Sequence, residues 1–207
     1  MKEDLLRQIA DKAYTISYAA NLNFATYDIV TKAPGRIAFL TIVAGILGLG
    51  WPELTARWLS VVILILGVTN VYIRKFTSDI GSYKNRGIKN TEQWNKLRGL
   101  YVKLKSMDAA ADFSNAVKEF TVIEQEFNDG AEPDQIIFSN WLAHFKLFCE
   151  KDVGWMDEQL HFGLWRDKIP QTAKACLIVL VIAITIYYCI AVPQLNALFS
   201  KLLFIEK

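Results

Sequence analysis

Apolar residues gather in three windows that contain no charged side chain. The windows are residues 37–52 (IAFLTIVAGILGLGWP), 58–73 (WLSVVILILGVTNVYI) and 175–200 (ACLIVLVIAITIYYCIAVPQLNALFS). A bilayer core of roughly 30 Å takes about 20 helical residues, so the third window is long enough and the first two are short. Arginines at the edges of the short windows can extend their stems to the interface, where Trp also sits well, so both still predict spans.

The first two windows are separated only by residues 53–57, which predicts a helical hairpin over residues 36–74. The alternative is a hairpin buried inside a soluble protein. A chain of 207 residues has no second layer large enough to cover two such helices. The pattern therefore favours a membrane hairpin.

Basic residues at the edges of the windows predict the orientation of the hairpin. Lys32 and Arg36 precede the first window, and a dense basic run follows the second. The positive-inside rule then places the N-terminus and residues 75–168 in the cytoplasm. Whether residues 175–200 also span is left open, and Pro193 is expected to kink or end that helix.

The segment before the hairpin has a helical pattern. Apolar or small residues recur at steps of three and four, and Pro34-Gly35 is expected to end the helix. The stripe comprises Leu5, Ile9, Ala13, Ile16, Ala20, Phe24 and Tyr27. Because few charges line the opposite face beyond Lys12, we expect this helix to pack against protein rather than lie on lipid.

Helical stripes also continue after the hairpin. Gly87 interrupts the first of them, a second closes near Gly130, and Pro133 is expected to open a third. Their apolar positions are Phe76, Ile80, Tyr83, Trp94, Leu97, Tyr101, Leu104; then Phe113, Ala116 or Val117, Phe120, Ile123, Phe127; then Ile137, Trp141, Phe145 and Phe148. No stretch alternates with period two.

The predicted fold class is therefore an all-α integral membrane protein. An N-terminal amphipathic helix (1–35) leads into the transmembrane hairpin (36–74). A helical cytoplasmic domain (75–168) and a third transmembrane helix with its tail (169–207) follow.

The net charge is only +2, from 23 Lys and Arg against 21 Asp and Glu, which argues against a nucleic-acid partner. That balance conceals two opposed segments, because residues 74–105 carry a net +7 and residues 106–134 a net −7. The two segments can pair as antiparallel helices. Alternatively, the basic one attracts anionic lipid, at about 1 kcal/mol per residue, or a phosphate-bearing ligand. The juxtamembrane candidates are Arg74, Lys75, Lys84, Arg86 and Lys89.

Catalytic signatures are absent from the sequence, so we expect no enzyme activity, no cofactor and no metal site. A metal site could be assembled from His144, Cys149 and Glu150, but the first two lie on different sides of a helix. A histidine packed in the core is expected instead. The adjacent acids Asp157 and Glu158 have no histidine or thiol at useful spacing and suit a helix start or a salt-bridged turn.

Small and polar residues in the hairpin predict a packing face. These are Ala38, Thr41, Gly45 and Gly48 in the first window and Ser60, Gly67 and Asn70 in the second. Small residues let membrane helices approach closely, and Asn70 offers an interhelical hydrogen bond. The face either closes the hairpin or forms an oligomer or a pore lining. Because Gly45 lies on this face and Ala44 lies beside it, Gly45→Leu should impair assembly or activity more than Ala44→Leu. The windows contain no ionisable residue, which counts against a proton-coupled transporter.

Two local sequences resemble those of a known family. They are DKAYTISYAANLNFATYDIVTKAPG at 11–35 and SNWLAHFKLF, GWMDEQLHF and DKIP within 139–170. With the hairpin, they are similar to the bacterial SLATT family, two-transmembrane effector domains associated with nucleotide-signalling defence systems. The third apolar window departs from the two-span pattern.

The resemblance implies an effector that oligomerises and forms a pore or disrupts the inner membrane. It also implies a signal, a nucleotide second messenger, and that messenger's synthase as a partner, and it carries over no catalytic residue. The alternative function is a membrane-anchored scaffold that recruits a soluble partner through the charged segments. An integral-membrane enzyme is the third and least supported class.

Overall fold

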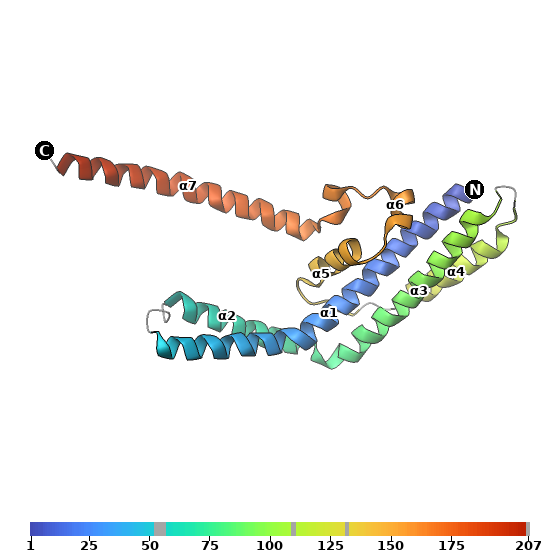
Figure 1. Cartoon of the computed structure of the whole chain (residues 1–207), viewed down its shortest axis with the longest axis horizontal. Helices are drawn as coiled ribbons and strands as arrows, with labels where there is room; N and C mark the ends of the chain where they lie inside the picture. The colour runs from blue at the N-terminus through green and yellow to red at the C-terminus, as the bar shows by residue number, and fades with distance from the viewer. Residues whose placement is uncertain (52–56, 109–110, 131–132, 206–207) are drawn as a thin grey trace. The chain divides into compact units, whose positions relative to one another are not determined.

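The computed structural model describes residues 1–51, 57–108, 111–130 and 133–205, and every regular element within them is helical (Figure 1). The helices are α1 (Lys2–Gly50), α2 (Arg57–Arg74), α3 (Ile80–Ser106), α4 (Ser114–Asn128), α5 (Ser139–Phe145), α6 (Gly154–Leu160) and α7 (Gln171–Ile205). A 3-10 turn (Thr77–Asp79) joins α2 to α3, and π-helical turns occupy Lys146–Glu150 and Leu164–Lys168. The all-α prediction is confirmed.

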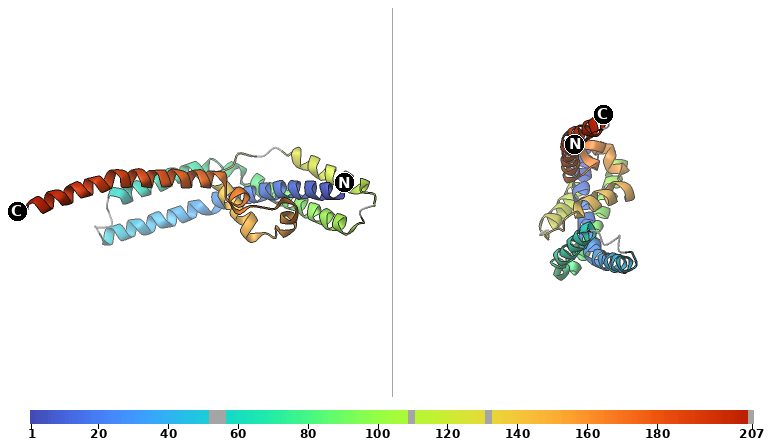
Figure 2. Two further views of the ribbon diagram at one scale, coloured as in Figure 1. Left: turned by 90° about the horizontal axis from the view of Figure 1, so that it is seen from above. Right: turned by 90° about the vertical axis from the view of Figure 1, so that its left-hand side faces the viewer.

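The chain forms two compact units, residues 1–162 and 163–207. In the first unit α1 is the central element, and α2, α3, α5 and α6 all pack against it (Figure 2). The second unit contains a π-helical turn followed by α7. By length and apolarity α1 and α7 can cross a membrane, and α2, taken with α3 across a 43° bend, gives a third crossing.

The N-terminal stripe packs on α3, as predicted. Ile9, Ala13 and Ile16 are fully buried and share one core with Leu97 and Leu104 of α3. Burying such aliphatic side chains contributes roughly 1.5–3 kcal/mol each. The apolar stripe of α1 is therefore a protein-packing surface along its first half.

The expectation that Pro34-Gly35 ends this helix was wrong. α1 continues through Pro34 as one helix of 49 residues, although Figure 1 shows it changing direction along its length. Proline removes one backbone hydrogen bond, a cost of about 3 kcal/mol. Packing on both sides offsets that cost, because Val30 before the proline and Ile37 after it join the same apolar cluster as Ile73. The sequence boundary at residue 35 thus lies inside a continuous helix.

Gly87 does not interrupt α3. It is buried in the middle of the helix, where a Cβ atom would lie 2.7 Å from Cε1 of the Phe24 ring. The glycine therefore provides the space in which the α1 aromatic ring packs. The stripe continues on both sides of it, with Tyr83 and Tyr101 each about 1% exposed.

Residues 133–138 form no regular element and α5 begins only at Ser139, so the expectation of a helix start at Pro133 was wrong. The Tyr83 hydroxyl donates to the Asp134 carbonyl (2.6 Å), and Thr26 Oγ1 contacts Gln135 Oε1, which holds this segment against α1 and α3. Ile136 is buried, whereas Ile137 is 60% exposed. Ile137, the first residue of the predicted apolar face, is therefore exposed, and Ile136 is the buried residue instead.

Pro193 was expected to kink or end the third helix; α7 extends past it to Ile205, so the helix does not end there. In lipid an unpaired backbone group is costly, and a continuous helix satisfies all but the one hydrogen bond that proline removes. Residues 177–188 of α7 are exposed along their whole length, as in a helix that faces lipid. Within the same unit, the Lys174 ammonium lies 5.8 Å from the Trp165 ring centroid.

Candidate functional site

The two hairpin helices meet along a seam of half-buried residues. On α1 these recur at steps of four, three and four, with Val43 as a further half-buried residue, and on α2 they follow the same steps. The seam residues are Ile37, Thr41, Ala44 and Gly48 on α1 and Leu59, Ile63, Leu66 and Asn70 on α2. This spacing keeps the seam on one side of each helix.

The predicted small-residue face is divided between the seam and the outer surface. Thr41, Gly48 and Asn70 lie in the seam. The others, Ala38, Gly45, Ser60 and Gly67, are exposed, and no atom lies within 4 Å of a Cβ placed on Gly45 or Gly67. Ile37 explains the rotation of α1, because it packs into the apolar cluster at the base of the hairpin and turns Ala44 inward. Thr41 and Gly48 therefore contribute to closing the hairpin, whereas a role of Ala38 and Gly45 in an oligomer or a pore lining stays a prediction.

Asn70, which was expected to offer an interhelical hydrogen bond, lies in the seam. Its Oδ1 atom is buried and has no partner among the described residues. A buried carbonyl without a donor costs about 1–3 kcal/mol. The hairpin therefore contains one polar position whose hydrogen-bonding capacity is unused.

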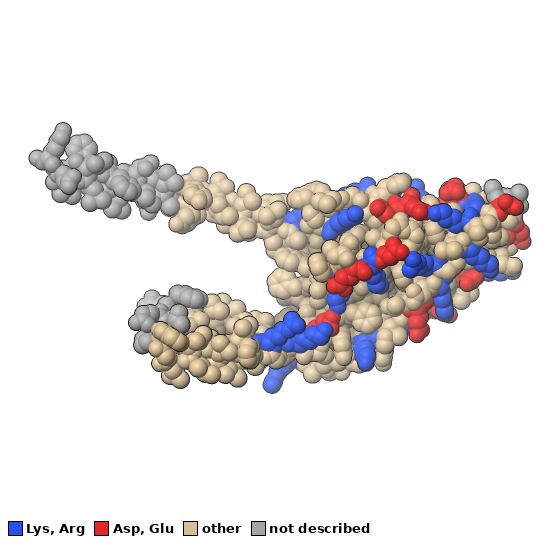
Figure 3. All heavy atoms as spheres, viewed as in Figure 1, with Lys and Arg blue, Asp and Glu red and all other residues tan. Residues whose placement is uncertain are grey.

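Within residues 37–51 and 59–73 the hairpin carries no charged side chain, and basic side chains gather at its base (Figure 3). Of the predicted juxtamembrane residues, Arg74, Lys75, Lys84 and Lys89 are exposed and Arg86 is half-buried. The structure therefore places four of these five cations in solvent.

Arg86 and Lys89 lie together at a cleft between α3 and α4. The cleft has a volume of about 240 Å³, and Asn90, Glu126 and Phe127 also line it. The Arg86 guanidinium donates to the Ser82 hydroxyl at 3.3 Å. The Asn90 side chain is 6% exposed, and its Nδ2 has no partner in the described part of the chain. The cleft thus combines two cations and an unused amide donor with one carboxylate.

The opposed charge segments lie on neighbouring helices but do not neutralise each other directly. Within the described ranges, no ion pair joins a base of residues 74–105 to an acid of residues 106–134. Their charges pair elsewhere, as Lys12–Glu124 (2.9 Å), Arg98–Asp152 (2.8 Å) and Lys105–Glu158 (2.5 Å). Much of the α3 charge is therefore left facing solvent.

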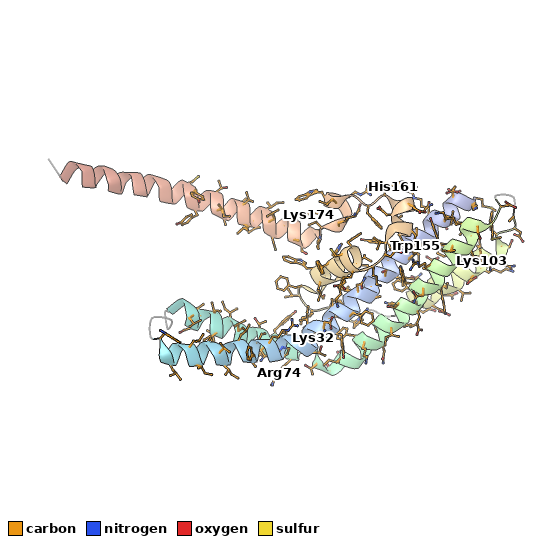
Figure 4. All side chains as sticks on the ribbon, in the orientation of Figure 1. Lys32, Arg74, Lys103, Trp155, His161 and Lys174 are labelled. Carbon is orange, nitrogen blue, oxygen red and sulfur yellow. The ribbon has the colours of Figure 1, made fainter. Side chains whose placement is uncertain are left out.

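A second charged cleft, which the sequence did not indicate, lies where α1 approaches the membrane window. Asp28 accepts hydrogen bonds from Lys32 (2.6 Å) and Lys146 (2.5 Å), and Arg36 lines the same cleft of about 340 Å³. The steps of four from Asp28 to Lys32 to Arg36 are the only signal in the sequence. Lys146 comes from the π-helical turn after α5, so its approach depends on the tertiary fold. Figure 4 shows Lys32 at the base of the hairpin.

The residues considered for catalysis or metal binding have structural contacts. The His144 ring packs against Tyr18 (5.0 Å between centroids) and Phe148 (6.0 Å), as expected of a packed histidine. Asp157 accepts the Phe162 N–H, and Glu158 accepts from Lys105. Within the described residues no group of His, Cys, Asp and Glu is arranged to hold a metal ion.

The comparison with protein families decides the assignment. The family model SLATT_6, described as SMODS and SLOG-associating 2TM effector domain 6, matches residues 1–177. The chain belongs to this family. The match takes in the hairpin and both clefts, and it stops near the start of α7, which extends to Ile205. No curated protein and no solved structure matches the chain.

The family assignment and the apolar helices together identify a membrane protein. The SLATT domain is a two-transmembrane effector domain associated with defence systems, so a membrane effector role follows. Most of the predicted third helix lies beyond the matched residues. α7 is therefore largely additional to the two spans of the family.

Asp28 predicts how the stability of this SLATT domain depends on pH. Burial alone would raise the pKa of the Asp28 carboxyl, but hydrogen bonds from Lys146 and Lys32 outweigh it and hold the pKa below its usual value. The stabilisation is present above the unfolded-state pKa, roughly 4, and is lost as the pH falls through the lower folded-state pKa.

Asp28→Asn should therefore destabilise the protein by about 1 kcal/mol at pH 7 and by less near pH 3. Thermal unfolding in detergent across this range measures it. Asp11→Asn, an exposed position on the same helix, is the matched control and should show no such difference. An equal effect of the two substitutions at both pH values would contradict the role of Asp28.

Proposed function

We propose that this SLATT protein is an effector of a bacterial defence system that oligomerises in the inner membrane and permeabilises it on receiving a signal. The observation that supports this most directly is the continuity of α1. One helix runs from the buried core on α3 through Pro34 into the membrane hairpin. A conformational change in the core between α1 and α3 can therefore be transmitted to the hairpin along one helix, without a flexible linker.

The proposed topology has the N-terminus and residues 75–168 in the cytoplasm. The start of α1 lies against the end of α3, because Lys2 Nζ donates to the Lys105 and Met107 carbonyls. Both therefore lie on one side of the membrane. The basic residues at the base of the hairpin favour the cytoplasmic side.

The proposed signal is a nucleotide second messenger, made by a synthase that acts as a partner. The cleft at Arg86 and Lys89 supports a phosphate-bearing signal, because cations are suited to phosphate oxygens. The buried Asn90 amide adds a hydrogen-bond donor without a partner in the described chain. Glu126 at the rim disfavours simple inorganic anions and favours a ligand that also presents a hydrogen-bond donor.

Membrane potential during phage infection tests the effector function. Bacteria that express the chain with its synthase should depolarise after infection, and an undisturbed potential would contradict the proposal. The alternative function is a membrane-anchored scaffold, favoured by the solvent-facing charges of α3. Replacing the hairpin with an unrelated two-span anchor separates the two, because a scaffold should continue to work and an effector should not.

The cleft between α3 and α4, at Arg86 and Lys89, allows a separate test of signal binding. Arg86→Gln with Lys89→Gln should lower the response to infection by about tenfold, since each lost phosphate contact weakens binding. Membrane depolarisation measures this response. Lys103→Gln with Lys96→Gln, which removes equal charge from α3 outside the cleft, is the control and should keep the response. Equal losses would assign the effect to net charge.

A further inference from the structure

The cleft around Asp28 has the composition of a lipid headgroup site. Three cations, Lys32, Arg36 and Lys146, surround a single carboxylate, so the cleft retains a net positive charge. Asp28 pairs with the two lysines and positions them. Arg36 forms no ion pair with any described residue, so its charge is available to a ligand.

Half of the residues that line the same cleft are apolar. Ile29, Ala33, Ile37 and Leu142 line it beside the cations. Ile37 is also the first residue of the charge-free window that enters the membrane. The cleft therefore opens at the depth where lipid headgroups meet acyl chains.

Exposed apolar residues lie in the same segment as Leu142 and Lys146 of the cleft. Ile137, Phe138 and Phe145 are 60%, 59% and 56% exposed. The preceding residue, Ile136, packs in the cluster with Ile73 at the end of α2, which fixes the segment at the base of the hairpin. Phe138 has a φ of 70°, a costly backbone conformation for a residue with a Cβ, at the turn where its ring is exposed. The segment that carries Ile137 and Phe138 therefore lies beside the base of the hairpin.

We infer that the α1–α5 cleft binds the headgroup of an anionic phospholipid, with Lys32, Arg36 and Lys146 on the phosphate and Ile137, Phe138 and Phe145 in the interface. A free phosphate would use the cations but would leave the apolar wall and the exposed rings in water. An anionic lipid uses both, because its phosphate and acyl chains are joined in one molecule. The site would fix α5 to the membrane surface beside α1.

Native mass spectrometry of the full chain in detergent, titrated with phosphatidylglycerol or phosphatidylcholine, tests the inference. The protein should retain phosphatidylglycerol in preference to phosphatidylcholine. Arg36→Gln with Lys146→Gln should weaken that retention by about tenfold. Arg74→Gln with Lys75→Gln removes the same charge at the end of α2, near the same depth, and should change retention less than twofold.

Three outcomes would overturn the inference. Equal losses from both double variants would indicate diffuse attraction to the basic base of the hairpin. Equal retention of the two lipids would show that the cleft does not recognise an anionic headgroup. Displacement of the lipid by inorganic phosphate at equal concentration would indicate a free-phosphate site. Arg36→Gln alone, at an exposed position, provides a variant that leaves the packing intact, and it should still lower retention.

Discussion

Gly87→Leu is expected to destabilise the folded protein by about 2–3 kcal/mol, as overpacking of a close contact does. Even the first added atom, Cβ, would lie 2.7 Å from the Phe24 ring, and the remaining side-chain atoms would need space between α1 and α3. The Phe24 ring would have to leave its place between α1 and α3, the two helices that share most of the core. Thermal or denaturant unfolding of the detergent-solubilised chain measures the loss.

Gly99→Leu on the same helix is the matched control. Gly99 is exposed, and no atom lies within 4 Å of a Cβ placed there. Leucine is the better helix former, so this substitution should stabilise α3 by about 0.5–1 kcal/mol. A loss of the same size at both positions would show that the Phe24 contact does not require glycine. Phe24→Ala combined with Gly87→Leu should recover part of the stability.

Ala44→Leu is expected to damage the hairpin more than Gly45→Leu, by about 1–3 kcal/mol. Ala44 is half-buried in the seam with α2, whereas Gly45 is exposed with open space around its Cα. The order is the reverse of the one that the small-residue spacing predicts. Cross-linking between α1 and α2, through cysteine pairs placed across the seam, measures whether the hairpin remains closed.

Gly45→Leu then tests the oligomer separately. If copies of the chain meet through the exposed small residues Ala38, Gly45, Ser60 and Gly67, the substitution should reduce the oligomeric mass in detergent and the depolarisation together, with the α1–α2 cross-link unchanged. Close approach of membrane helices requires small residues, so leucine at the contact separates them. Unchanged mass and unchanged depolarisation would remove these residues from the assembly.

The clefts differ in how far the sequence indicated them. The cleft between α3 and α4 contains Arg86 and Lys89, which the basic run after the second window had already marked. The α1–α5 cleft needs Lys146, which lies 118 positions from its partner Asp28 along the chain. Neither residue is unusual in its local sequence, so only the packing of α5 on α1 brings them together.

The sequence by itself determined the helical fold class, the two membrane windows, the stripe that packs α1 on α3 and the family resemblance. These follow from local composition and from helical periodicity, which act within a few turns. The tertiary structure decided what depends on neighbours. Packing at Val30 and Ile37 allows α1 to continue through Pro34. The Phe24 ring requires glycine at position 87. The packing of Ile37 places Ala44 rather than Gly45 in the seam. In each case a contact between distant residues, whose free energy exceeds the local preference, determines the outcome.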